Sequence, residues 1–214
     1  LVNADVMSRK VSTRDRNSYP LIGDAAAITL VGRCDDARPI HANLQMDGRR
    51  REALMIPAGG LREPSSAATR VAHADAEGNL RARDDLVMDG SAVFNFVQTE
   101  VPPMIEALLA SAGTDMAAVD AFLFHQPNRF MLQKLAEKLH IPCEKMPSNV
   151  VEHFGNSSGV TIPLALAFNL RERVCRETLT AVFGGFGVGL TWSSLLMPLG
   201  PLAFCEMIDY PQVN

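Results

Sequence analysis

The chain has 214 residues, of which 47% are hydrophobic and 21% charged, and its formal net charge at pH 7 is −4. This composition is typical of a globular protein with one substantial core. It argues against a nucleic-acid binder, because neutralising phosphates requires a basic surface that these residues do not supply. Four widely spaced cysteines without a CxxC pair indicate neither a zinc site nor a thioredoxin-like motif. Reduced thiols and a cytoplasmic location are therefore expected.

The first third of the chain predicts two strands and then a long irregular segment. LVNADV at the start is typical of the end of a strand, so we expect a preceding segment and a partner strand for its edge. AAAITLVG, residues 25–32, is a continuous apolar run that predicts a strand covered on both faces. Residues 33–90 are polar and rich in Gly, Pro, Ser and Arg, which favours loops with short strands. Within them, the three arginines at 49–51 suit a solvated loop better than a patch for an acidic partner.

Helical and strand patterns alternate from residue 91 onward. Residues 91–112 have helical spacing interrupted by Pro102 and Pro103, which predicts a kink or two helices. VDAFLFHQ, residues 119–126, predicts a buried strand, and residues 128–140 predict a helix with Asn128 as its N-cap. A short strand around 144–149 and a helix from 155 to about 173 follow, with Pro163 shifting or bending the first turn of that helix.

The segment from Thr178 to Cys205 contains no charged residue. Its glycines and prolines divide it into the short apolar runs TLTAVF and LTWSSLLM, which favour a buried hairpin over a membrane-spanning helix. The order of elements is then strand, helix, strand, helix, strand, strand. Such alternation predicts an α/β fold in which helices pack on a mostly parallel sheet with an antiparallel last strand.

Two side chains stand where predicted strands lead into helices, His125 in FLFHQPNRF and Asn156 in EHFGNSSGVTIP. Together they can offer two neutral N–H donors to one oxygen. Donors organised in this way stabilise an enolate or a tetrahedral oxyanion made from a thioester. A single histidine after an apolar strand is more often structural, but the second motif favours an acyl-transfer site.

Five segments, in this order and spacing, resemble the C-terminal half of 3-oxoacyl-(acyl carrier protein) synthase III, the ketoacyl synthase III branch of the thiolase-like superfamily: GDAAA, MDGSAVFNF, FLFHQPNR, HFGNSSGVTIPLAL and GFGVGLTWSS. The resemblance runs from Leu1 to about Met197. It implies a thiolase-like layered fold, with residues 1–214 as one αβ half whose mixed five-stranded sheet is flanked by helices. Residues 33–90 would be loop-rich decoration and residues 198–214 a C-terminal extension.

The resemblance also implies a catalytic Cys–His–Asn triad, with the histidine at His125 and the asparagine at Asn156. The nucleophilic cysteine belongs to the N-terminal half of the family, and no cysteine of this chain occupies its position. The implied reaction is condensation of an acyl thioester with a malonyl thioester. The malonyl group loses carbon dioxide, and the resulting enolate attacks the acyl group on the cysteine.

The glycine-rich segment GFGVG resembles a second oxyanion element of the family. The resemblance assigns the backbone N–H of Val188 to this element, and Gly187 and Gly189 would allow a close approach of the backbone. Phe186 matches an aromatic residue that shields the site in the family, although an ordinary core position would equally account for it.

Two positions depart from the family pattern. Basic residues that dock the acidic acyl carrier protein in several family members are replaced here by Asn95 and Phe130. Arg129 and Lys138 are nearby and are weak candidates for that role. The carrier is therefore open between acyl carrier protein, coenzyme A and a specialised carrier.

The implied partners are the N-terminal half bearing the cysteine, a second whole synthase unit in a dimer, and acyl-coenzyme A and malonyl thioester as substrates. Acyl carrier protein is a further candidate. No metal or redox cofactor, nucleic acid or membrane span is implied. Two alternatives to the condensing enzyme stay open, namely a non-catalytic subunit of a heteromeric synthase and an acyltransferase acting on a small-molecule acceptor.

Overall fold

A computed structural model describes residues 1–35 and 38–209 of the chain. The helices and strands are β1 (Val2–Asp5), β2 (Ala25–Ile28), β3 (His41–Met46), β4 (Leu54–Met55), β5 (His73–Ala74), β6 (Leu80–Arg81), β7 (Val87–Met88), α1 (Gly90–Ser111), β8 (Ala121–Phe124), α2 (Arg129–Leu139), α3 (Val150–Phe154), α4 (Thr161–Arg176), β9 (Leu179–Gly187) and β10 (Thr191–Leu199). The short 3-10 turns are η1 (Met7–Lys10), η2 (Tyr19–Leu21), η3 (Gly48–Ala53), η4 (Cys143–Lys145) and η5 (Ser158–Val160).

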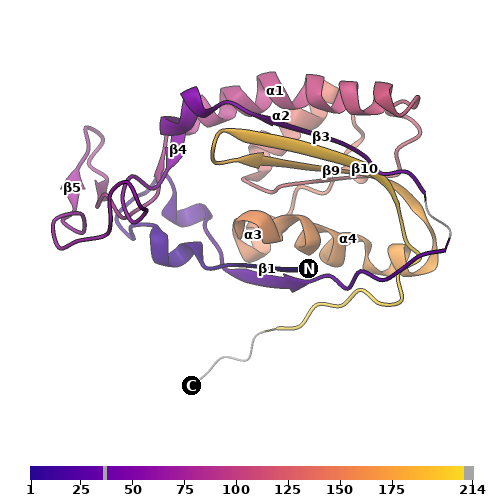
Figure 1. Ribbon diagram of the computed structural model, residues 1–214, viewed down its shortest axis with the longest axis horizontal. Helices are drawn as coiled ribbons and strands as arrows, with labels where there is room; N and C mark the ends of the chain where they lie inside the picture. The colour runs from indigo at the N-terminus through magenta and orange to yellow at the C-terminus, as the bar shows by residue number, and fades with distance from the viewer. Residues whose placement is uncertain (36–37, 210–214) are drawn as a thin grey trace.

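The elements form layers around one mixed sheet with the strand order β3-β10-β9-β8. β8 runs parallel to β9, while β10 is antiparallel to both of its neighbours. Helices α1 and α2 lie on one side of this sheet, and α3 and α4 lie on the other, with the β1–β2 pair beyond them (Figure 1). The prediction of an α/β fold with an antiparallel last strand is confirmed, but the sheet is mixed rather than mostly parallel, because among its described strands only β8 and β9 run parallel to each other.

The sheet itself differs from the expected five strands. It has four within the described residues, because β1 and β2 pair with each other as a separate antiparallel ribbon. The expected strand around 144–149 is wrong, since that segment holds η4 and a loop. Instead, β3 supplies the edge strand from the segment expected to be loops with short strands. Its residues alternate polar and apolar over only six positions, too short a pattern to separate from the surrounding loops.

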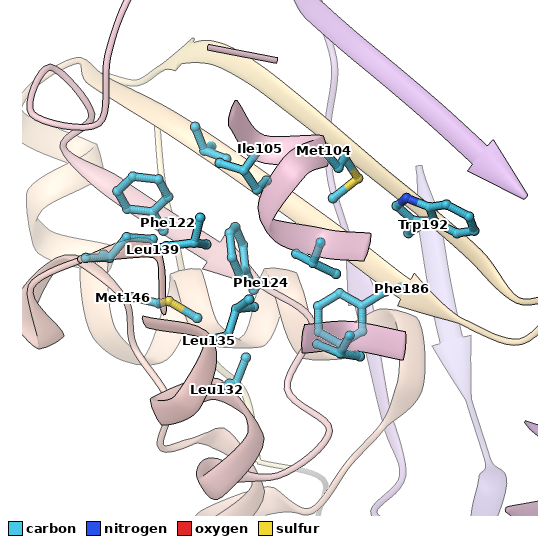
Figure 2. Packing of buried hydrophobic residues seen from close by; sticks show 14 of the residues in the cluster. Met104, Ile105, Phe122, Phe124, Leu132, Leu135, Leu139, Met146, Phe186 and Trp192 are labelled. Carbon is cyan, nitrogen blue, oxygen red and sulfur yellow. The ribbon is translucent and has the colours of Figure 1, made fainter. Parts of the chain in front are cut away.

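The main core lies between the sheet and the helices α1 and α2. Phe122 and Phe124 of β8 are fully buried and face Ile105 of α1 and Leu135 of α2 (Figure 2). The four-residue spacing that predicted α2 is confirmed, because Met131, Leu135 and Leu139 are buried while Gln133 and Glu137 are exposed. Burying an aliphatic or aromatic side chain in this way stabilises a fold by about 1.5–3 kcal/mol.

Helix α1 is continuous through Pro102 and Pro103, so the alternative of two helices is wrong. A proline lacks the N–H that would bond the carbonyl four residues earlier, which leaves the Gln98 oxygen without its helical donor. Lys138 of α2 supplies one, since its Nζ lies 2.6 Å from that oxygen. Contact between the two helices thus replaces a hydrogen bond that the sequence of α1 cannot make.

Arg50 is more enclosed than a solvated loop would allow. Its guanidinium pairs with Asp47 at 3.1 Å and with Glu100 of α1 at 2.9 Å. It also lies over the rings of Phe96 and Trp192, at 5.3 Å and 5.7 Å from their centroids. One arginine of the basic run therefore joins η3, α1 and β10, a contact that charge patterning alone does not reveal.

The face of the sheet that carries α4 is covered only in part. Asn43 of β3 donates from Nδ2 to the Met104 carbonyl of α1, so its neighbours along β3 point to the opposite face. There Leu44 and Met46 are 71% and 70% exposed, and Leu195 of β10 is also exposed. Within the described residues, α4 covers the β8 and β9 part of this face and leaves the β10 and β3 part open.

The β1–β2 ribbon likewise exposes apolar side chains. Val2 pairs with Ile28, and both are exposed on the same face of the ribbon. Leu30 and Val31, which continue the apolar run after β2, are each 75% exposed. The expectation that residues 25–32 form a strand covered on both faces is therefore wrong for the described part of the chain.

Two further expectations concern the helix that contains Pro163 and the C-terminal extension. Helix α4 begins at Thr161, after η5, and not at 155 as expected, and Pro163 lies in its first turn. In the expected extension 198–214, β10 ends at Leu199, and residues 210–214 lie outside the described residues, as do 36 and 37 within the expected 33–90 segment. None of the described helices is long and apolar enough to cross a membrane.

Candidate active site

His125 stands directly after β8, at the end of the strand. Its backbone N–H donates to the Gly184 carbonyl of β9 at 2.8 Å, which continues the ladder by one residue. The edge of its imidazole ring packs against Phe186 with 5.5 Å between the ring centroids. Burial lowers the pKa of His125 to about 4, against a smaller opposing contribution from hydrogen bonding to the Ser158 backbone. The imidazole is therefore neutral at pH 7.

Asn156 lies in the turn between α3 and η5. Its Oδ1 accepts the backbone N–H of Ser158 at 2.9 Å. This bond fixes which end of the amide faces the turn and leaves the Nδ2 hydrogens for another acceptor. Ser158 itself has a left-handed backbone conformation, with φ at 53°, which turns the chain sharply between Asn156 and α4.

The turn that holds Asn156 is fixed by the segment before β2. The Asn156 N–H donates to the Leu21 carbonyl at 2.6 Å, and the Gly23 N–H donates to the Asn156 carbonyl at 3.1 Å. A Cβ on Gly23 would lie 1.9 Å from the Phe154 carbonyl oxygen, so only glycine fits. Gly155, with φ at +73°, meets Gly23 from the other side. The glycine of GDAAA thus positions Asn156, a role that sequence reasoning missed.

Two polar residues of the matching segments serve the fold, and Asn128 does so as the sequence predicts. Asn128 caps α2, since its Oδ1 accepts the Met131 N–H at 2.8 Å. Asp24 fixes the turn before β2 by accepting hydrogen bonds from the backbone N–H and the hydroxyl of Ser8. Both side chains are occupied by local structure rather than free for a ligand.

Thr161 brings the two motifs together, and sequence reasoning did not single it out. Its fully buried Oγ1 lies 2.7 Å from Nδ1 of His125 and accepts the Gln126 N–H at 3.1 Å. The same hydroxyl lies 2.8 Å from the Ser158 carbonyl. The sequence offered one signal, the position of Thr161 five residues after Asn156 in the same motif.

The glycine-rich segment forms the turn between β9 and β10. Val188 is 62% exposed at the tip of this turn. Gly189 has φ at +139°, and a Cβ there would lie 2.2 Å from Oγ1 of Thr191, so glycine is required. A Cβ on Gly187 would meet no atom within 4 Å, so in this structure no close approach explains that glycine. Phe186 is buried against His125, which gives it a contact with the site.

Both weak candidates for carrier docking are engaged within the fold. Arg129 pairs with Glu152 of α3 at 2.7 Å, and Lys138 bonds the Gln98 carbonyl. Beside them Phe130 is 60% exposed and stacks on Phe94 of α1, with 5.7 Å between the centroids. A groove of about 410 Å³ lies next to α2 and includes Arg129 in its lining.

The arrangement can present neutral hydrogen-bond donors to an oxygen. His125 is uncharged, and its Nδ1 is already paired inside the protein. Asn156 is held with its amide nitrogen unoccupied by the turn. Donors fixed by the fold need no rearrangement when charge develops on a bound oxygen. Among the described residues, no group of three or more His, Cys, Asp and Glu side chains could hold a metal ion.

Comparison with known proteins gives the site a context. Residues 109–199, which include His125, Asn156 and the β9–β10 turn, match the family model for the C-terminal part of 3-oxoacyl-[acyl-carrier-protein] synthase III. Beta-ketoacyl-[acyl-carrier-protein] synthase III of Porphyra umbilicalis is 32% identical over 197 residues, covering 92% of this chain and 58% of that protein. The chloroplastic enzyme of Arabidopsis thaliana is 32% identical over 203 residues, covering 92% of this chain and 49% of that protein. The chain spans about half the length of such relatives.

Solved structures agree with the sequence comparison. The crystal structure of 3-oxoacyl-(acyl-carrier protein) synthase from Burkholderia xenovorans LB400 superposes with a TM-score of 0.88 at 36% identity, covering 98% of this chain and 58% of that one. The priming beta-ketosynthase of the R1128 polyketide biosynthetic pathway has a TM-score of 0.72 at 26% identity, covering 93% of this chain and 56% of that one. In sequence and in fold, the chain is similar to the C-terminal portion of 3-oxoacyl-[acyl-carrier-protein] synthase III, and residues 109–199 match that family's model.

Proposed function

We propose that the chain is the C-terminal portion of a β-ketoacyl synthase III-like condensing enzyme. In this reaction a malonyl thioester loses carbon dioxide, and the enolate that forms attacks an acyl group held on a cysteine. The observation that carries the proposal is the pair of neutral donors, His125 with its pKa lowered to about 4 and Asn156 with its amide oxygen already bonded. Relatives named as synthases of this type support it.

The chemistry requires donors of this kind. Decarboxylation moves the electron pair of the breaking C–C bond onto the thioester, so negative charge develops on the thioester oxygen. We assign one N–H from His125 and one from Asn156 to that oxygen. Neither group takes up or releases a proton while the charge appears. Removing one such donor costs on the order of a hundredfold to a thousandfold in rate.

We further propose that the turn between β9 and β10 serves the acyl-enzyme carbonyl. The Val188 N–H is assigned to this second oxyanion position, with the conformation of Gly189 setting the turn. Phe186, packed on the His125 ring, would keep water from that side of the imidazole. These roles rest on the resemblance and on the contacts within the turn.

The nucleophilic cysteine is proposed to come from the N-terminal portion that longer relatives contain. The half-covered sheet face supports this, since the exposed side chains of β3 and β10 beside α4 would accept an apolar helix. The exposed apolar face of β1 and β2 is a second surface that the N-terminal portion would bury. Among this chain's own thiols, burial raises the pKa of Cys205, which disfavours the reactive thiolate there.

The substrates are proposed to be an acyl-coenzyme A and a malonyl thioester, with no metal or redox cofactor. Arg129 and Lys138 already have partners. Asn95 and Phe130 stand where the resemblance implies basic residues, and Phe130 stacks on Phe94. This favours coenzyme A or a specialised carrier over a purely ionic contact with acyl carrier protein. The dimer of whole units and the cytoplasmic location stay predictions, and one relative is chloroplastic.

The test is reconstitution with the cysteine-bearing portion, followed by assay with acyl-coenzyme A and a malonyl thioester. The wild-type pair should release carbon dioxide and form a 3-oxoacyl product. Asn156→Ala should lower the rate of condensation on the order of a hundredfold to a thousandfold, while Asn169→Ala, at an exposed position of α4, should leave it unchanged. Wild-type condensation rates in Asn156→Ala would refute the proposal.

Two alternatives predict other results in the same assay. An acyltransferase acting on a small-molecule acceptor would load the cysteine and form product without releasing carbon dioxide. The observation that favours an acceptor other than acyl carrier protein is the exposed Phe130, which stacks on the partly buried Phe94. A non-catalytic subunit would give neither product, with or without the cysteine-bearing portion.

A further inference from the structure

A neutral imidazole exists in two tautomers, and only one of them suits the proposed role of His125. The hydrogen lies on Nδ1 or on Nε2, and the other nitrogen is then an acceptor. Nδ1 of His125 faces Thr161 inside the protein, so the substrate oxygen can be met only by Nε2. A hydrogen on Nε2 would bond this oxygen, whereas a lone pair there would repel it. The tautomer is therefore as important to the reaction as the charge.

Three groups surround the single hydroxyl of Thr161. The Gln126 N–H can only donate to its oxygen, and the Ser158 carbonyl can only accept from it. The third group, Nδ1 of His125, can do either. The hydroxyl has one proton, so it can donate to the Ser158 carbonyl or to Nδ1, but not fully to both.

The Ser158 carbonyl does not depend on that proton. The backbone N–H of Thr161 already donates to it as the cap of η5. Turning the hydroxyl toward Nδ1 therefore leaves no carbonyl unpaired, and the Thr161 oxygen still accepts the Gln126 N–H. Every polar atom of the cluster named here then has a partner, which is the condition for a stable buried network.

We propose that Thr161 is a positioning residue whose hydroxyl donates to Nδ1 of His125 and so holds the hydrogen of the imidazole on Nε2, facing the substrate. This inference rests on the proposed function for its purpose but not for its geometry. Without the hydroxyl, Nδ1 would retain a hydrogen and donate it to the Ser158 carbonyl, which lies within hydrogen-bonding reach of the ring. Nε2 would then present a lone pair to the thioester oxygen.

The direct test is nitrogen NMR of protein labelled with ¹⁵N at histidine, because a ring nitrogen that carries a hydrogen differs clearly in shift from one that does not. The signals of His125 are assigned by their loss in His125→Gln. We expect the wild-type ring to carry its hydrogen on Nε2, Thr161→Ser to retain this tautomer, and Thr161→Val to move the hydrogen to Nδ1. A wild-type ring with its hydrogen on Nδ1 would overturn the inference, whatever the Thr161 variants show.

Kinetics separate the inference from the proposed function. In the reconstituted synthase, Thr161→Val should lower kcat for decarboxylation on the order of a hundredfold or more with little change in KM, and Thr161→Ser should restore most of it. Equal rates in the Val and Ser variants would contradict the role of Thr161. If wild-type protein shows the Nε2 tautomer but never condenses acyl groups, the proposed function fails while the assignment of the tautomer stands.

Discussion

A His125→Gln variant should lose part of the pH dependence of stability that the wild-type protein shows between pH 6.5 and pH 4. An unfolded histidine takes up a proton as the pH falls below its ordinary pKa of 6.5, whereas burial holds the pKa of folded His125 at about 4. Within this window unfolding binds a proton, so the stability of the native state falls as the pH falls. Above 6.5 both states are neutral and His125 contributes nothing.

The size of the effect follows from the difference between these two pKa values. Each pKa unit corresponds to about 1.4 kcal/mol, so the free energy of unfolding should fall by roughly 3 kcal/mol across the window through His125 alone. Below pH 4 the loss is complete. Glutamine does not titrate, so the variant lacks this component. Asp15, whose pKa is lowered to about 2, loses its stabilising contribution only as the pH falls below 3.8, outside the window.

The assay is urea unfolding of both proteins at pH values above, within and below the window, with the difference in free energy plotted against pH. Titrations that the two proteins share cancel in this difference. A difference that changes by about 3 kcal/mol supports a histidine kept neutral by burial. A flat difference, or an NMR titration of His125 with a midpoint near 6.5, would refute the reasoning, because the imidazole would then become charged within the working range of many enzymes.

The remaining predictions concern two structural contacts. Gly23→Ala should destabilise the protein by about 1–3 kcal/mol, because its Cβ would collide with the turn that holds Asn156, whereas Gly60→Ala, with no atom within 4 Å, should change the free energy of unfolding by less than about 0.5 kcal/mol. Equal unfolding midpoints for these two variants would contradict the close contact. Lys138→Met should lower the free energy of unfolding by about 1 kcal/mol, because it leaves the Gln98 carbonyl of α1 unpaired. Lys134→Met, which breaks only an exposed ion pair with Glu137, should lower it less. Thermal unfolding of both variants compares them, and a larger loss in Lys134→Met would contradict the role of Lys138.

Helices α1, α2 and α4 and the strands β8, β9 and β10 could be predicted because each carries a local signal, whereas the short helix α3 was not predicted. Asn128 caps α2 as its residue type and position indicate, and the four-residue spacing of Met131, Leu135 and Leu139 marks the buried side of the helix. The glycines between β9 and β10 mark the hairpin turn. In these elements the residues that decide the structure lie within one or two turns of each other.

The failures come from contacts between distant segments. Pro102 and Pro103 predict a kink or two helices, but Lys138, far along the chain, bonds the freed carbonyl and α1 is a single helix. β3 becomes part of the sheet because β10 offers it an edge, not because its own six residues have a strong strand pattern. Local propensity is overridden in both cases by a partner that the sequence does not identify.

The site shows the same division between local and distant information. His125 and Asn156 were predicted as site residues from residue type and motif, since donors of this kind are recognisable chemistry. The residues that orient these two side chains were not predicted. Thr161 contacts His125 across 36 residues of sequence, and Gly23 holds Asn156 through a backbone bridge. A histidine and an asparagine with no such supports would offer the same atoms in unfixed directions. The rate advantage of fixed donors comes from avoiding that reorganisation, so substitutions at Thr161 and Gly23 should affect the reaction nearly as strongly as changes to the donors themselves.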